Sequence, residues 1–418
     1  MDTSVFRERL QNLISQQWFL EGFVAPDYSG LNLKNLVPQI AALFGVGTPY
    51  CSTLPSDCLA ENEGVEKVML VILDGLGYNR LLHHINSHNG TFAEIAEKGT
   101  LKPLTTVFPS TTSTALTSLF SGLSPAQHQI IGYHMFSKKY GLIYNTLDMK
   151  PVYGYSSRVE LAKDYAHQIP LLAPLLEERG ICVSAITRSH IAGSGLSQIT
   201  HRDQTPTPYL LASDMWTHSA QALQKNSPML SIVYYSGVDT LAHKYGPYSK
   251  EVTFELTTLE HNIADFVGGL SEEIKKETLL VFAADHGVVE VGKSVYLKDC
   301  PELMQHLQLP PVGDCRASYL FCKPNREQEF REAFERQSER FKLMLTDDLI
   351  GKGVFGEPLS RDLLKEKLGT FTALSSGGDV LDYPYFEEDR QSPQRGAHGG
   401  MTAEEMIIPL LSIRLSQL

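Results

Sequence analysis

The stretch VMLVILDGLG, residues 68–77, decides the fold. Its first six residues are all apolar, which is typical of a strand that is buried on both faces. Asp74 and Gly75 follow at once and end the strand in a polar turn. Further apolar runs of this kind lie at 182–187, 230–235, 279–283 and 406–413. We therefore predict that these segments are buried strands of a mostly parallel sheet.

Segments with helical periodicity separate the predicted strands. Between 251 and 270 the apolar residues recur every three or four positions, which gives a helix one buried face. Residues 168–179 show a similar pattern, and Gly180 is typical of a helix end. Strands that alternate with helices predict an α/β fold in which helices cover both faces of a mostly parallel central sheet.

The remaining segments suggest a division of the 418 residues into three parts. Residues 1–60 are predicted to form a helical N-terminal extension. Residues 300–394, which are rich in turns, are predicted to form a small inserted lobe. The core then comprises residues 61–299 and 395–418, an organisation for which the chain is long enough.

Composition limits the classes of partner. With 42% apolar and 20% charged residues, the chain is typical of a globular enzyme. Its net charge of −12 argues against stable nucleic-acid binding, which needs clustered Lys and Arg. A phosphorylated substrate is compatible with an acidic protein, because bound divalent cations reverse the local field.

We expect a cytoplasmic protein that does not enter a membrane. No run approaches the roughly 20 apolar residues that span a bilayer, and the segment 1–17 lacks the continuous apolar stretch of a secretory signal. The six cysteines contain no CxxC pair and are expected to be reduced. The sequence leaves the oligomeric state open.

Asp and His residues gather where the predicted strands end. The carboxyl ends of parallel strands lie at the edge of the sheet where functional groups collect. Each residue alone is more often a turn or a helix cap. Together their oxygen and nitrogen ligands suit zinc or manganese. The candidates are Asp74, Asp239, His243, Asp285, His286 and His398.

The hydroxyl-rich segment 108–114, FPSTTST, supplies candidate nucleophiles. It precedes a short apolar helical run, so its hydroxyls lie at a helix N-terminus. The positive end of the helix dipole favours bound phosphate at such a position. Because Ser and Thr are also common caps, one hydroxyl is expected to cap the helix and another to act as the nucleophile.

Taken in order, these pieces make the sequence resemble the alkaline phosphatase superfamily, and most closely its type I phosphodiesterase/nucleotide pyrophosphatase branch. The resemblance spans 71–411, most of the chain. The matching pieces are VILDGLG (71–77), VFPSTT (107–112) with SGLSP (121–125), GVDTLAHKYGP (237–247), AADHG (283–287), and GAHGG (396–400) with EEMIIPLL (404–411).

The resemblance implies two divalent metal ions, with zinc expected and manganese or iron as alternatives. Asp239, His243 and His398 would hold one ion; Asp74, Asp285 and His286 would hold the other. The family's spacing from Phe108 and Gly122 points to Thr112 as the nucleophile, with Ser110 and Thr111 as alternatives. The implied reaction is hydrolysis of a phosphodiester or pyrophosphate bond in a small, nucleotide-type substrate through a phosphothreonine intermediate.

The sequence departs from the family's pattern in three places. Thr111 replaces a common lysine, and Ala242 replaces a glycine. Ala115 stands where the diesterases have an asparagine, so the contact to one phosphate oxygen is unassigned.

Three other functions compete with this one. A phosphomonoesterase or phosphomutase of the same superfamily is the nearest alternative. A sulfatase would need a C/S-x-P-x-R motif, which the nucleophile segment lacks. A non-catalytic binding protein that keeps the fold is disfavoured because all six ligand positions are filled.

Overall fold

The computed structural model describes residues 21–48, 50–154, 160–225, 228–337, 340–386, 390 and 394–418, to which all structural statements here refer. The first 20 residues of the predicted N-terminal extension lie outside the described residues. The described helical elements of its remainder are α2 (Leu36–Leu43) and the 3-10 turns η1 (Leu33–Asn35) and η2 (Ser56–Cys58).

A seven-stranded sheet forms the centre of the molecule. β1, which contains the apolar residues 68–73, lies in its middle, and all seven of its residues are buried. It pairs in parallel with β8 and β9. The strand order is β2 (Thr100–Thr105), β18 (Ile407–Arg414), β9 (Thr278–Ala283), β1 (Lys67–Leu73), β8 (Met229–Tyr235), β6 (Cys182–Arg188) and β7 (Thr207–Tyr209).

The sheet is mixed rather than parallel throughout. The last strand, β18, runs antiparallel to both of its neighbours, β9 and β2. Placing the run 406–413 in a parallel set was therefore wrong in direction, because an apolar run shows burial on both faces but not orientation. β2 and β7 were not predicted, since neither is a continuous apolar run.

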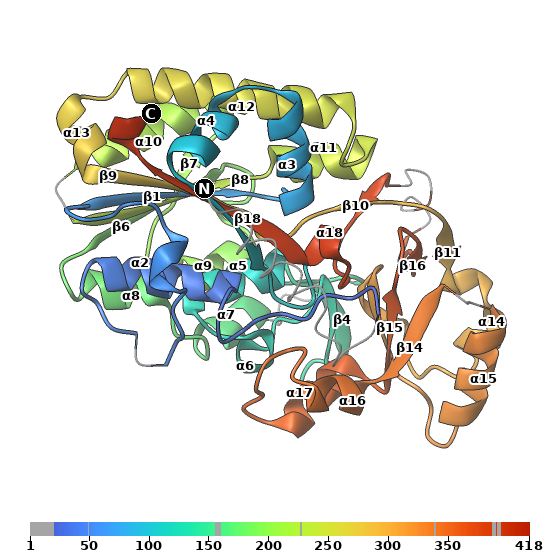
Figure 1. Ribbon diagram of the computed structural model, residues 1–418. Coiled ribbons are helices and arrows are strands. Elements are labelled where there is room, and N and C mark those ends of the chain that lie inside the picture. Colours follow the sequence, from blue (N-terminus) through green and yellow to red (C-terminus); the bar gives the residue numbers. More distant parts are fainter. Residues whose placement is uncertain are drawn as a thin grey trace.

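Helices cover both faces of this sheet, as predicted (Figure 1). In α12 the expected apolar stripe, from Val252 to Phe266, is buried. The predicted helix at 168–179 is shorter and spans Leu172–Glu177. Pro170 disfavours the helical conformation at Ile169, near its predicted start. One face carries α3 (Tyr78–Ser87), α4 (Thr91–Lys98), α10 (Ala212–Leu223), α11 (Gly237–Tyr245), α12 (Lys250–Gly268) and α13 (Glu272–Glu277). The other carries α2, α5 (Thr112–Ser121), α7 (Leu161–Ala166), α8 (Leu172–Glu177) and α9 (Gly195–Thr200).

A second sheet, antiparallel at every pairing, lies beside the first (Figure 1). This sheet joins strands from 134–151 to strands from the predicted lobe. The boundaries of the lobe at 300 and 394 stay a prediction. The strand order is β14 (Phe341–Leu345), β15 (Phe371–Ser375), β13 (Ala317–Leu320), β12 (Val312–Asp314), β3 (His134–Ser137), β4 (Leu142–Asn145) and β5 (Lys150–Pro151).

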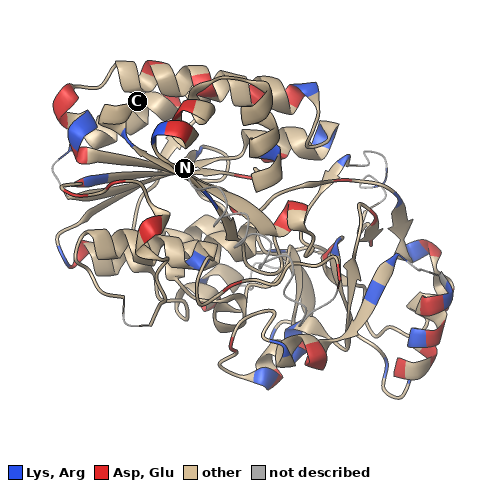
Figure 2. Ribbon diagram, in the orientation of Figure 1, with Lys and Arg blue, Asp and Glu red and all other residues tan. Residues whose placement is uncertain are grey.

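Short elements complete the described chain. Two small sheets pair β10 (Val289–Glu290) with β17 (Gly396–Ala397) and β11 (Ser294–Tyr296) with β16 (Val380–Asp382). The remaining helices include α6 (Pro125–His128), α14 (Pro301–Met304), α15 (Glu327–Gln337), α16 (Thr346–Gly351), α17 (Arg361–Leu368) and α18 (Ala403–Met406). Charged residues lie mainly on outer helices such as α12 and α15 (Figure 2). No described helix is long and apolar enough to cross a bilayer.

Candidate metal centre and active site

The turn after β1 brings two candidate ligands together. The Asp74 backbone N–H donates to the Tyr235 carbonyl (2.9 Å), which continues the pairing of β1 with β8. Gly75 then adopts a left-handed φ of +74°, and a Cβ there would lie 2.8 Å from the Asp239 Cβ. Glycine is thus required both for the turn and for the close approach of α11.

Asp74, Asp285 and His286 form a buried group at the ends of β1 and β9. The His286 Nε2 lies 3.4 Å from Asp74 Oδ1 and 3.5 Å from Asp285 Oδ2. The other oxygen of each carboxylate is already bonded. The Tyr234 hydroxyl donates to Asp74 Oδ2, and the backbone N–H groups of Gly75 (3.2 Å) and His286 (3.0 Å) donate to Asp285 Oδ1. The two oxygens that face the imidazole make no hydrogen bond.

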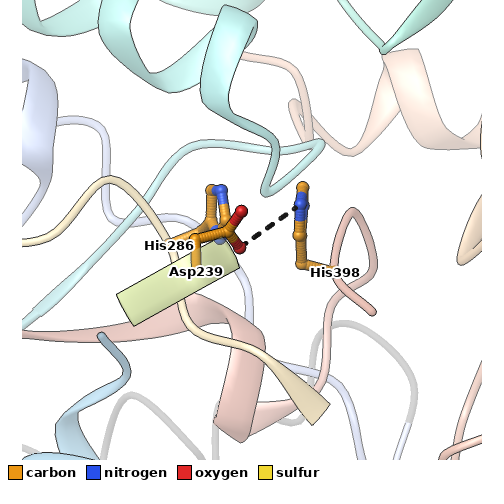
Figure 3. A group of neighbouring side chains, drawn as sticks. All are labelled: Asp239, His286 and His398. Atoms are coloured by element: carbon orange, nitrogen blue, oxygen red, sulfur yellow. Dashed lines mark ion pairs between the residues drawn. The ribbon is translucent and has the colours of Figure 1, made fainter. Parts of the chain in front are cut away.

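Asp239 joins this group to the remaining histidines. Its Oδ1, which is buried without a hydrogen bond, lies 3.3 Å from His243 Nε2 and 4.0 Å from His398 Nε2. Figure 3 shows Asp239 and His398 facing each other with His286 beside them. The His286 and His398 rings stack at 3.8 Å. Ligand atoms of Asp239, His286 and His398 lie within 4.8 Å of one another, so these three residues could also hold a metal ion. The structure thus gathers all six candidates, while their division into two triads stays a prediction.

Backbone carbonyls orient the three imidazoles. Each Nδ1 lies within hydrogen-bond distance of a carbonyl oxygen, so that each Nε2 faces the carboxylates. This arrangement fixes the tautomer and orientation of metal-binding histidines. The pairs are His243 with Gly396 (2.8 Å), His286 with Gly287 (3.1 Å) and His398 with Ser110 (3.1 Å).

The electrostatics of the cluster fit divalent cations. Burial raises the pKa of Asp74 well above its usual value, and the charges of Asp285 and Asp239 raise it further. Burial also lowers the pKa of His398, and the neighbouring imidazole of His286 adds to this effect. Buried carboxylates and crowded imidazoles with free ligand atoms are costly unless cations compensate them. The donor set of oxygen and nitrogen atoms therefore suits metal ions.

Thr112 is the hydroxyl of the nucleophile segment that faces this cluster. It is the first residue of α5, and its Oγ1 lies 3.1 Å from His286 Nε2. At this position the hydroxyl also lies at the positive end of the helix dipole. Its assignment as the nucleophile stays a prediction.

The two alternative hydroxyls have other partners. Ser110 Oγ donates to the Gly400 carbonyl (2.8 Å) and accepts from the Gly399 N–H (3.2 Å), which holds the loop that carries His398. Thr111 occupies the N-cap position of α5, but its side chain does not cap the helix. It lines the cavity together with Asp314.

A buried ion pair that was not predicted from the sequence links the second sheet to the loop that carries His398. Arg316, between β12 and β13, makes two bonds of 2.9 Å to Glu405, and both side chains are fully buried. Glu405 in turn accepts from the Gly400 N–H (2.8 Å). Glu405 lies in the EEMIIPLL piece, but Arg316 lies in a short turn that contains no recognisable motif. Tyr234 was not predicted as a site residue, because its position in an apolar strand indicates only burial.

A cavity of about 910 Å³ opens onto the site. Thr112, Asp239, His243 and His398 line one part of it. Its other walls come largely from the second sheet and from the segments next to β11 and β16, and they are rich in aromatic side chains. These are Tyr133, His134, Tyr296, Tyr383, Tyr385 and Phe386. The cavity is therefore large enough for a substrate well beyond an inorganic phosphate ion.

Solved structures that share the fold include those of the following two proteins. Murine ectonucleotide pyrophosphatase/phosphodiesterase 5 matches with a TM-score of 0.60 and 16% identity, over 82% of this chain and 87% of that one. Phosphonoacetate hydrolase from Sinorhizobium meliloti, solved with phosphonoformate, matches with a TM-score of 0.59 and 15% identity, over 82% and 89%. At these identities the likeness concerns the fold alone.

Two curated proteins match over short stretches. The catalytic subunit of human GPI ethanolamine phosphate transferase 3 is 38% identical over 61 residues, 15% of this chain and 5% of that protein. The mouse protein is 35% identical over 75 residues, 18% and 6%. This chain thus spans only a small part of the transferases' length.

The family model of type I phosphodiesterases/nucleotide pyrophosphatases matches residues 68–368. The match covers most of the chain and confirms the resemblance inferred from the motifs. The chain therefore belongs to the type I phosphodiesterase/nucleotide pyrophosphatase family, within the alkaline phosphatase superfamily.

Proposed function

We propose that the chain is a two-metal hydrolase that cleaves phosphodiester or pyrophosphate bonds in small, nucleotide-type substrates, with Thr112 as its nucleophile. The observation that carries the proposal is the cluster of unbonded carboxylate oxygens and imidazole Nε2 atoms, with Thr112 Oγ1 3.1 Å from His286 Nε2. The murine phosphodiesterase named above was also solved with AMP, as an inactive variant in which a threonine is replaced by alanine.

The six clustered residues would hold the ions, and zinc is the first expectation. Asp74, Asp285 and His286 would form one site, and Asp239, His243 and His398 the other. When bound, two divalent ions would make the threonine hydroxyl a stronger nucleophile and stabilise the charges of attacking and leaving oxygens.

The chain's own residues would carry the bond changes. Thr112 Oγ1 would lose its proton and form a bond to phosphorus as the bond to the leaving oxygen breaks. This gives a phosphothreonine that keeps the other ester group, and a released alcohol or phosphate group whose oxygen takes up a proton. Water would then cleave the new bond and restore the hydroxyl. The N-terminus of α5 favours the negative charge at this position, and the cavity leaves space for the two ester groups.

Replacing Thr112 tests the proposal. Thr112→Ala should abolish hydrolysis of bis(p-nitrophenyl) phosphate while metal content, measured by mass spectrometry, stays at the wild-type level. Thr112→Ser should keep partial activity, because it retains a hydroxyl. Wild-type rates in the alanine variant would exclude the covalent scheme at this residue.

A further inference from the structure

Asp314 places a carboxyl group beside the nucleophile segment. It ends β12, is 9% exposed and lines the cavity together with Thr112. Its Oδ2 accepts a hydrogen bond from the Tyr133 backbone N–H (3.3 Å). Burial raises its pKa, and the neighbouring Thr111 hydroxyl partly offsets this effect. A Cβ on Gly399 would lie 3.2 Å from Asp314 Oδ1, so the carboxyl also adjoins the loop that carries His398.

This carboxyl lies in a cavity with little fixed positive charge. Among the described lining residues, Lys150 is the only lysine or arginine, and it is exposed. Ala115, where the family's diesterases have an asparagine, is fully buried and offers no donor for a phosphate oxygen. The negative charge of a bound phosphate group would therefore lie between the ligand cluster, where cations would attract it, and the Asp314 carboxylate, which would repel it.

The number of charges on the phosphate group then decides which substrate is favoured. A phosphodiester carries one negative charge, whereas a monoester carries nearly two at neutral pH. A carboxylate that lines the same cavity opposes each of these charges, and the interaction is stronger in a partly buried site than in bulk water.

We propose that Asp314 sets a preference for phosphodiesters over phosphomonoesters at this site. The inference rests on the proposed function and decides between the diesterase and monoesterase alternatives. Asp314 would act by opposing the second charge of a monoester, without taking part in bond cleavage.

The test compares two substrates with the same leaving group, p-nitrophenyl phosphate and its methyl ester. Burial raises the pKa of Asp314 to about 7, so the rates are measured at about pH 9. Asp314→Asn removes the charge and keeps the shape. We expect the diester-to-monoester ratio of kcat/KM to fall by about tenfold or more. Asp347→Asn, an exposed carboxylate on α16 that pairs with Lys365, makes the same change in net charge and should leave the ratio unchanged.

Binding provides a second readout that does not depend on turnover. In a Thr112→Ala background, Asp314→Asn should bind phenyl phosphate about tenfold more tightly, as measured by calorimetry. A ratio within twofold of wild type, or an equal loss of both rates with normal metal content, would overturn the proposal. If Asp314→Asn fails to fold, Asp314→Ser replaces it, because the serine hydroxyl can still accept a hydrogen bond from the Tyr133 N–H. The same changes in rate ratio and affinity are expected for it. Retention of both rates by Thr112→Ala alone would instead overturn the proposed function.

Discussion

The two large sheets differ in what they contribute to the site. The central sheet supplies the ligand cluster from the ends of β1, β8 and β9 and from the loop before β18 (Figure 1). The second sheet supplies none of the six candidate ligands. Its residues instead wall the cavity and, through Arg316, hold the loop that carries His398.

Strand direction explains the difference. Parallel strands end at the same edge, so acidic and imidazole groups that follow them meet at one place. Neighbouring strands of an antiparallel sheet end at opposite edges, which spreads their terminal residues apart. The comparison suggests that the central sheet determines the chemistry and the second sheet the choice of substrate.

The largest expected effect comes from the central sheet. Asp285→Asn keeps an oxygen for the N–H groups of Gly75 and His286 but places an amide where Oδ2 faces the imidazole. We expect metal content to fall sharply and kcat/KM to drop at least about a thousandfold, because the variant loses metal charge at the transition state. Metal analysis and kinetics on the same samples provide the measurement.

A buried carboxylate far from the cluster is the control for Asp285. Glu260 on α12 is 4% exposed and bonds His84 (3.0 Å). Glu260→Gln should lower stability without changing metal content. Full metal content and normal turnover in Asp285→Asn would remove Asp285 from the site.

Arg316 tests whether the second sheet is coupled to the chemistry. Arg316→Met would leave Glu405 buried without its partner, at a cost of about 3–5 kcal/mol in unfolding free energy. Because Glu405 also bonds the Gly400 N–H, we expect a loss of kcat even at temperatures where the variant is fully folded.

Urea unfolding of single and double variants separates coupling from simple loss of stability. The double variant Arg316→Met/Glu405→Gln should cost clearly less than the sum of the single variants, because their side chains form one network. Additive costs, with kcat unchanged in the folded protein, would show that the second sheet stabilises the molecule without positioning the loop.

The same contrast explains what the sequence could predict. The continuous apolar strands β1, β6, β8, β9 and β18 and the helical stripe of α12 have regular patterns, and the six candidate ligands lie in short motifs, so the sequence predicts them. The direction of β18 depends on pairing between distant segments, which an apolar run does not encode. Asp314, Arg316 and Tyr234 act through tertiary contacts of ordinary strand and turn residues, so their roles could not be predicted.

Tyr234 is expected to have a smaller effect on the central sheet's site. Its hydroxyl donates to Asp74 Oδ2 and leaves Oδ1 facing His286. Tyr234→Phe should weaken metal binding by about 10–100-fold, which is typical for loss of a group that orients a ligand. Competition with a chelator gives the affinity. Tyr235→Phe is the matched control, because that hydroxyl bonds Glu255 and should leave metal affinity unchanged.

The smallest effect is expected at the cavity wall beside the second sheet. Tyr133, just before β3, lines the cavity, is 39% exposed and packs against His134 at 4.5 Å. In Tyr133→Ala the backbone N–H that bonds Asp314 is kept. KM for an aryl diester should therefore rise about three- to tenfold, as expected for loss of one aromatic contact, while kcat and metal content stay constant. KM for a dialkyl diester should change less, because it offers no ring. A fall in kcat with unchanged KM would instead place Tyr133 among the groups that position the reaction, and the division of roles between the two sheets would not hold there.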